Sequence, residues 1–259
     1  DWHSDECLFV EVLKASIIAR PDYAAARRQL IDLHINMGQY QDAHDLAVET
    51  RNIIKGVPLH SAYVAKCLLK LNAFDQAKQV AKEVLRQSIE EELAFDVLFL
   101  ASQNETEREE ALAFVREQMS TQVMFGDNAW NYWFEAKACL SKASLLDFVS
   151  YLLKEHAHLW QSHCIAGMYH SQVGDMDAAI DVLKAGCARF PLIPRVQFDL
   201  GMTYEAQGEF NDAIACYQTA LGLNPEWNTV AKQLADLQEN QGELDAALTT
   251  INNILKYTA

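Results

Sequence analysis

The 259-residue sequence has little proline and glycine, and it has no long apolar run. Five prolines and ten glycines interrupt the chain. This scarcity favours long helices, because these two residues are the ones that most disturb a helix interior. No stretch approaches the roughly 18 consecutive apolar residues of a membrane-spanning helix. The composition therefore predicts a soluble, all-helical protein without a membrane span.

Basic residues are also scarce. Lys and Arg number 21 against 36 Asp and Glu, which gives a formal net charge of -15. Such a chain repels phosphate backbones, and no basic stripe stands out along it, so we expect no nucleic-acid partner. The acidity indicates a solvated outer surface, and the alternative is that it attracts a basic partner.

The six cysteines lack the paired spacing of a disulfide framework. Three of them, Cys164, Cys187 and Cys216, fall in or beside segments expected to be packed helices, where a free cysteine behaves as a small hydrophobic residue. We therefore expect a reducing compartment and a cytoplasmic location.

A period of 34 residues runs through the chain. Alanine returns in one register at Ala43, Ala77, Ala111, Ala179, Ala213 and Ala247. Glycine follows the same period at Gly38, Gly174, Gly208 and Gly242. A fixed period of this length is typical of stacked helix-turn-helix units, each of which buries its apolar face only against its neighbours. The sequence therefore predicts an all-α solenoid of antiparallel helix hairpins.

Residues 198–225 resemble the tetratricopeptide repeat (TPR). The matching positions are Leu200, Gly201, Tyr204, Gly208, Phe210, Ala213, Tyr217, Ala220, Leu221 and Pro225. Small residues are expected where the two helices of a hairpin cross, glycine where the turn needs a positive φ, and proline where the second helix stops. The resemblance implies a right-handed superhelical solenoid.

The period divides residues 24–259 into seven repeats, with starts at residues 24, 58, 92, 126, 160, 194 and 228. Residues 1–23 are expected to form the second helix of a preceding partial repeat or an N-terminal capping helix. The third and fourth repeats keep the 34-residue length but lack the characteristic residues of the repeat. In the fourth, Trp133 occupies a small-residue position and Leu140 replaces the turn glycine. Because the chain opens half-way through a repeat and closes without a polar capping helix, we expect it to be a segment of a longer protein.

The TPR resemblance also assigns a binding surface, because in this family the first helix of each repeat lines a concave groove. The apolar groove positions are Tyr63, Val97, Leu100, Trp130, Phe134, Ile165, Met168, Phe198 and Met202, and the polar rim is Lys137, Arg195, Asp199 and Glu205. An exposed apolar patch of about 300–600 Å² usually indicates binding. The alternatives are that these bulky residues only contact each other, or that another domain of the same longer chain covers them.

TPR domains that hold the acidic tails of heat-shock chaperones use a clamp of Lys and Asn on one first helix, Asn on the next, and Lys and Arg on a third. The corresponding places here hold Arg28 and Asp32, then Tyr63, then Leu93 and Val97. The clamp is therefore missing, and we expect no binding of chaperone tails.

One cluster of residues resembles a metal site. It contains His156, His158, His163, Cys164 and His170. The repeat register puts His163 and His170 at helix-packing positions and the first two histidines in a turn, so we expect no metal there. Because a glycine-rich phosphate loop, a nucleophile elbow and an HExxH motif are all missing, we also expect no catalytic residue, no cofactor and no enzymatic activity.

Two classes of function remain. The first is a non-enzymatic scaffold that holds a peptide, a helix or a protein surface in the concave groove, through an apolar stripe in repeats three to six. The alternative is a substrate-recruiting arm of a larger enzyme, such as a glycosyltransferase.

Overall fold

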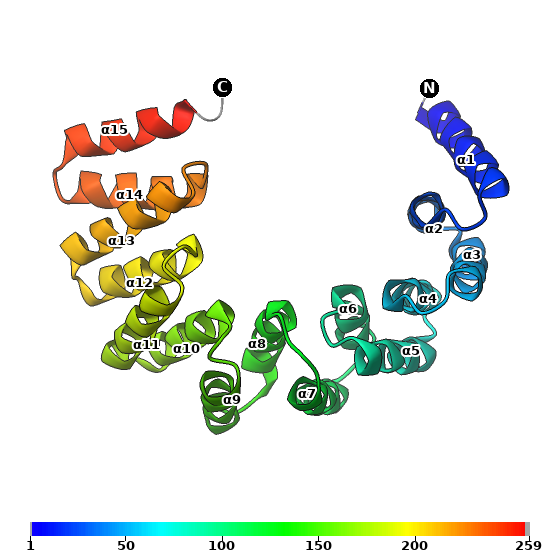
Figure 1. Cartoon of the computed structure of the whole chain (residues 1–259), viewed down its shortest axis with the longest axis horizontal. Coiled ribbons are helices and arrows are strands. Elements are labelled where there is room, and N and C mark those ends of the chain that lie inside the picture. The colour runs from blue at the N-terminus through cyan, green and yellow to red at the C-terminus, as the bar shows by residue number, and fades with distance from the viewer. Residues whose placement is uncertain (1, 257–259) are drawn as a thin grey trace. The chain divides into compact units, whose positions relative to one another are not determined.

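The computed structural model describes the backbone of residues 2–256 and the side chains of residues 8–256. Within that range the regular elements are fifteen helices joined by short turns (Figure 1). Most helices pack against the helix that follows them in the chain, as in α4 and α5 or α12 and α13. The predicted all-α fold of sequential helix hairpins is confirmed.

The fold consists of two compact units, Asp1–Leu140 and Ser141–Ala259, each described here by itself. The first unit contains α1 (Trp2–Ala19), α2 (Ala24–Asn36), α3 (Tyr40–Ile53), α4 (Pro58–Lys70), α5 (Phe74–Gln87), α6 (Glu92–Leu100), α7 (Glu105–Thr121) and α8 (Asp127–Cys139). The second unit contains α9 (Lys142–Glu155), α10 (Trp160–Val173), α11 (Met176–Arg189), α12 (Pro194–Gln207), α13 (Phe210–Leu223), α14 (Asn228–Asn240) and α15 (Leu244–Leu255).

The α12–α13 hairpin shows how the sequence sets the helix ends. Pro194 occupies the first turn of α12, where its missing N–H breaks no helical hydrogen bond. Gly208 ends the same helix with φ of 85°, a left-handed conformation that glycine adopts without steric cost. Helix α13 then begins at Phe210, so the two helices are antiparallel neighbours.

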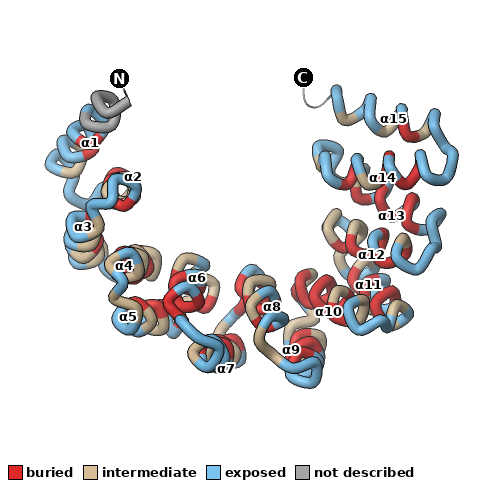
Figure 2. Tube along the Cα trace, turned by 180° about the vertical axis from the view of Figure 1, so that it is seen from behind, coloured by how far each residue is buried: buried red, intermediate tan, exposed pale blue. Residues whose placement is uncertain are grey.

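Small residues lie where the helices of a hairpin cross. The recurring alanines are buried, and Ala43, Ala77 and Ala213 have no exposed surface. Gly201 of α12 faces Tyr217 of α13 so closely that a Cβ atom at Gly201 would lie 2.6 Å from Cε1 of the tyrosine. Most helices carry buried residues toward their neighbours and exposed residues away from them (Figure 2).

Helix α8 is held at its start by a carboxylate from a distant part of the first unit. Glu90, in the turn before α6, accepts hydrogen bonds from the backbone N–H groups of Phe125 (2.7 Å), Gly126 (3.1 Å) and Asn128 (3.2 Å). Gly126 is the N-cap residue of α8 and has no side chain to do this. A carboxylate at a helix N-terminus satisfies free donors and interacts favourably with the helix dipole. Glu90 thus supplies the cap that the local sequence lacks.

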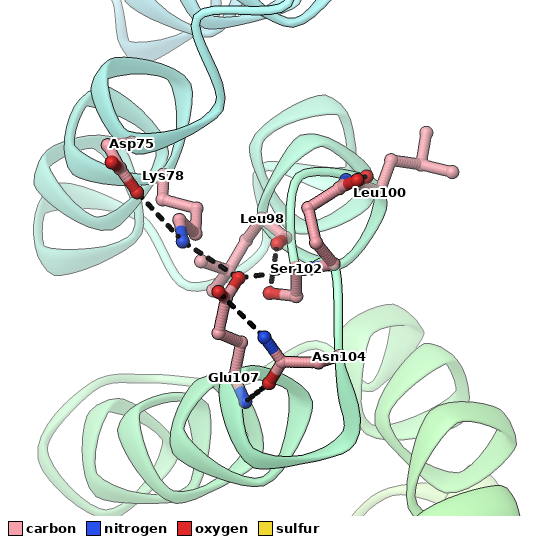
Figure 3. A network of polar contacts seen from close by, with 8 residues as sticks. Asp75, Lys78, Leu98, Leu100, Ser102, Asn104 and Glu107 are labelled. Atoms are coloured by element: carbon pink, nitrogen blue, oxygen red, sulfur yellow. Dashed lines mark hydrogen bonds and ion pairs between the residues drawn. The ribbon is translucent and has the colours of Figure 1, made fainter.

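A polar network joins α5 to α7 (Figure 3). The ammonium group of Lys78 lies 3.1 Å from Asp75 and 2.8 Å from Glu107. Glu107 also accepts a hydrogen bond from the side chain of Asn104, whose own oxygen caps α7 through the Glu107 N–H. The hydrogen bond from Lys78 lowers the pKa of Glu107. Because α6 packs mainly against α4 and α5, this network gives α7 a polar attachment to the preceding repeat.

Candidate functional site: a groove between α10 and α12

A groove of about 350 Å³ lies on the second unit, between α10 and α12. Met168 of α10 and Phe198 and Met202 of α12 contribute most of its apolar wall, and Arg195 and Asp199 of α12 contribute its charged groups. On α12, Arg195, the pair Phe198 and Asp199, and Met202 follow at intervals of three or four residues, so their side chains share one face of the helix. The groove therefore combines an apolar surface with one ion pair.

The apolar wall has a fixed part and an adaptable part. The ring of Phe198 lies 5.8 Å from the ring of Tyr217 and 5.2 Å from that of Trp227, measured between centroids. These contacts hold the phenylalanine in place. Met202 is 43% exposed, and Met168 is half-buried. Flexible thioether side chains of this kind adapt to ligands of different shape.

The ion pair leaves one carboxylate oxygen without a partner. Arg195 Nε donates a hydrogen bond of 2.8 Å to Asp199 Oδ1. Asp199 is only 9% exposed, and its Oδ2 atom is buried with no hydrogen bond of normal geometry. Burial raises the pKa of Asp199, although Arg195 and the nearby thiol of Cys164 act in the opposite direction. The positive charge of Arg195 therefore compensates only part of the cost of burying this carboxylate.

Glu205, the fourth residue of the predicted rim, serves a different contact. Its Oε2 atom accepts hydrogen bonds from the Tyr217 hydroxyl (2.6 Å) and from Gln233 Nε2 (3.0 Å). Burial, followed by the bond to Glu205, raises the pKa of Tyr217. Glu205 thus connects α12 with α13 and α14, and its Oε2 atom is already occupied by these two donors.

Trp130, Phe134 and Lys137 of α8 and Leu100 of α6 lie in the first unit and do not line the groove. The rings of Trp130 and Phe134 meet edge to face with centroids 5.7 Å apart. Lys137 Nζ lies 4.3 Å from the centre of the Phe134 ring, a cation–π contact. Phe134 is 43% exposed and Leu100 of α6 is 64% exposed.

Tyr63 joins two repeats of the first unit. Its hydroxyl donates a hydrogen bond of 2.9 Å to Asp32 Oδ2, and Lys66 Nζ lies 2.7 Å from Asp32 Oδ1. Burial and the bond to Asp32 raise the pKa of Tyr63 to about 12. The polar end of Tyr63 is therefore engaged between α2 and α4.

Two of the residues expected in the groove are buried. Val97 is 1% exposed and Ile165 is 0% exposed. Both lie among neighbouring helices, because α6 and α10 have buried residues around most of their circumference. For these two residues the expected position on the open surface needs correction, and they belong to the core.

The histidine cluster has packing contacts. His163 is 7% exposed, its ring nitrogens lie 3.2 Å from the Val182 carbonyl and 3.3 Å from the Ala157 carbonyl, and its ring meets that of Phe190. Among the residues that the structure describes, no group of three or more His, Cys, Asp or Glu is placed to hold a metal ion. Within the same residues, no helix combines the length and the apolar character needed to cross a lipid bilayer.

Residues 194–226, which include Arg195, Phe198, Asp199 and Met202 of the groove, match the family model of the tetratricopeptide repeat. Residues 194–226 therefore form a tetratricopeptide repeat. The groove is thus formed in part by the segment that fits the family model, and the TPR resemblance of residues 198–225 is confirmed.

Solved structures of IFIT1 share the fold. Human IFIT1, as a dimer with m7Gppp-AAAA, has 14% sequence identity and a TM-score of 0.52, and the match covers 95% of this chain and 63% of that one. A monomeric mutant of IFIT1 also has 14% identity and a TM-score of 0.52, with 89% and 59% covered. The chain thus spans less than two thirds of the length of these proteins. MamA from Desulfovibrio magneticus RS-1 has 15% identity, 91% and 94% coverage, and a TM-score of 0.33. No curated protein matches the sequence.

Two features of the groove were not visible in the sequence. The ring of Trp227 contacts that of Phe198, although Trp227 lies in the turn before α14 and is not one of the characteristic positions of the repeat. Which oxygen of Asp199 lacks a hydrogen bond depends on the Asp199 atom to which Arg195 Nε donates. Arg195 and Asp199 are four residues apart on a helix, which indicates an ion pair. The spacing does not indicate which oxygen of Asp199 remains without a hydrogen bond.

Proposed function

We propose that the protein is a non-enzymatic scaffold that binds a protein or peptide in the groove between α10 and α12. The observation that carries this proposal is the groove wall of half-buried Met168 and Phe198 and exposed Met202, beside an ion pair whose carboxylate is buried. A concave, mostly apolar site with a few placed polar groups is the usual form of a ligand site. Trp130, Phe134 and Leu100 of the first unit provide a second surface for the same class of partner.

A protein partner is favoured over a nucleic acid by charge. The IFIT1 structures contain m7Gppp-AAAA, a ligand with many phosphate groups. In this chain the second unit has twice as many Asp and Glu as Lys and Arg. Its field opposes phosphates, and it draws basic protein segments toward the groove.

We expect a double replacement in the groove wall, Met168→Ala with Met202→Ala, to weaken partner binding at least about tenfold. A tenfold loss corresponds to about 1.4 kcal/mol, less than the truncation of one central anchor side chain of an interface costs. The measurement is the affinity of peptides selected from a displayed library of random linear peptides against the whole chain, followed by fluorescence anisotropy.

The matched control is Leu146→Ala on α9. Leu146 is 44% exposed, close to the 43% of Met202, but it lies outside the groove. Binding should survive this change, and neither variant should lower the melting temperature strongly. Equal loss in both variants, or full binding by the double variant, would contradict a site in the groove.

We also propose a cytoplasmic location, supported by the thiols. Cys67, Cys139, Cys164, Cys187 and Cys216 are free, and Cys7 lies outside the described side chains. Burial raises the pKa of Cys67 and Cys187 to about 12, so these thiols are poor nucleophiles at neutral pH. Alkylation of denatured protein taken from cells under acid quench, read by mass spectrometry, should show every thiol reduced. A substantial disulfide-bonded fraction would contradict this location.

A further inference from the structure

The wall of the groove between α10 and α12 contains a carboxylate oxygen that no strong donor of the second unit satisfies, since its carboxylate has only the weak donor thiol of Cys164 beside Arg195. Asp199 lines the groove, is 9% exposed, and uses Oδ1 for Arg195, while Oδ2 is buried without a partner of normal geometry. A buried acceptor left in this state costs free energy that an incoming donor restores. The ligand should therefore bring an N–H donor past the apolar wall to this oxygen.

We propose that the groove receives a lysine side chain of the protein partner, with its stem along Met168, Phe198 and Met202 and its ammonium group at Asp199 Oδ2. This inference rests on the proposed function and names the partner's chemistry. The four-carbon stem of lysine covers apolar surface while its charged end reaches a polar group. One side chain thus meets both requirements of the groove.

The geometry selects lysine over arginine. A guanidinium group binds a carboxylate best through two parallel hydrogen bonds, which need both oxygens. Arg195 already occupies Oδ1, so a second guanidinium finds only one acceptor. The ammonium group of lysine is a compact donor that needs only one oxygen.

The electrostatics select a cation over a neutral donor. Burial raises the pKa of Asp199 despite the adjacent Arg195, so this carboxylate still lacks compensating positive charge. The second unit as a whole carries an excess of Asp and Glu. A lysine of the partner is therefore attracted both by the site and by the surface around it.

The test compares peptides from the displayed random library that bind the whole chain, using the wild type and Asp199→Asn. The variant keeps the shape of the side chain. Its amide oxygen can still accept the hydrogen bond from Arg195, and its NH₂ group then takes the place of Oδ2 and presents a donor to the ligand. Because ionised Asp199 is poorly compensated in the fold, its removal should not lower the melting temperature. The control is Asp181→Asn, which makes the same change of charge at an exposed position on α11.

We expect lysine-containing peptides to be enriched with the wild type and the control but not with Asp199→Asn. Replacing the lysine of a selected peptide with norleucine, which keeps the stem and removes the ammonium group, should weaken wild-type binding about tenfold or more. Arginine at that place should also bind more weakly. The lysine and norleucine peptides should bind Asp199→Asn equally well, because the carboxylate that the ammonium group would contact is gone.

The failures of the two proposals are distinguishable. Peptides that need Met168 and Met202 but bind equally with lysine or norleucine overturn the lysine inference and leave groove binding intact. A lysine effect that persists unchanged in Asp199→Asn also overturns it. Selected peptides that tolerate loss of both methionines, or a library that yields no binder, overturn the inference and the proposed function together.

Discussion

Trp133→Ala is expected to destabilise the first unit by about 3–5 kcal/mol, the range for removing a buried tryptophan. Trp133 is 0% exposed and is the largest of the fully buried side chains among the described residues. It lies on α8, which packs against α6 and α7. Replacement leaves a cavity between α8 and its neighbours, which adds to the lost burial of the ring. Urea unfolding followed by circular dichroism measures the effect.

Phe134→Ala is the matched control, on the next residue of the same helix. Phe134 is 43% exposed, so its removal should cost less than about 1 kcal/mol. Because repeat arrays unfold in separable parts, the comparison uses the transition that each variant shifts rather than a single total. If the two variants proved equally stable, Trp133 would not be the centre of the core around α8.

Gly201→Ala and Gly222→Ala should change stability in opposite directions. A methyl group at Gly201 would lie 2.6 Å from Cε1 and 2.8 Å from Cδ1 of Tyr217, whose ring is fully buried and whose hydroxyl is bonded to Glu205. The ring cannot move aside without losing that bond, so we expect a loss of about 1–3 kcal/mol. Gly222 on α13 has nothing within 4 Å of the added atom. There alanine should stabilise the helix by about 0.5–1 kcal/mol.

Thermal unfolding of both glycine variants and the wild type checks this pair. The two changes add the same atom, so they differ only in the space that receives it. A Gly201→Ala protein as stable as the wild type would mean that α12 and α13 do not approach as closely as described.

The fold could be predicted because one residue type, alanine, serves one geometric need in six of the seven repeats. Ala43, Ala77 and Ala213 are fully buried at helix crossings, where a larger side chain would separate the helices. Since that need returns with each hairpin, its period is visible in the sequence.

The groove could be predicted only in part. The register places Met168, Phe198 and Met202 on first helices, and the structure brings them to one groove. It did not reveal that Val97 and Ile165 are buried, because α6 and α10 are apolar around most of their circumference and the repeat pattern gives no preferred open face. The cap from Glu90 to the start of α8 was also invisible, since it joins residues far apart in the chain.

Hydrogen exchange of the whole chain with and without a selected peptide tests groove binding most directly. Backbone amides of α10 and α12 should become more protected when the peptide is bound, because their side chains form the walls of the groove. Helices α11 and α13 should change little. Protection that appears on α11 and α13 and leaves α10 and α12 unchanged would contradict the groove as the binding site.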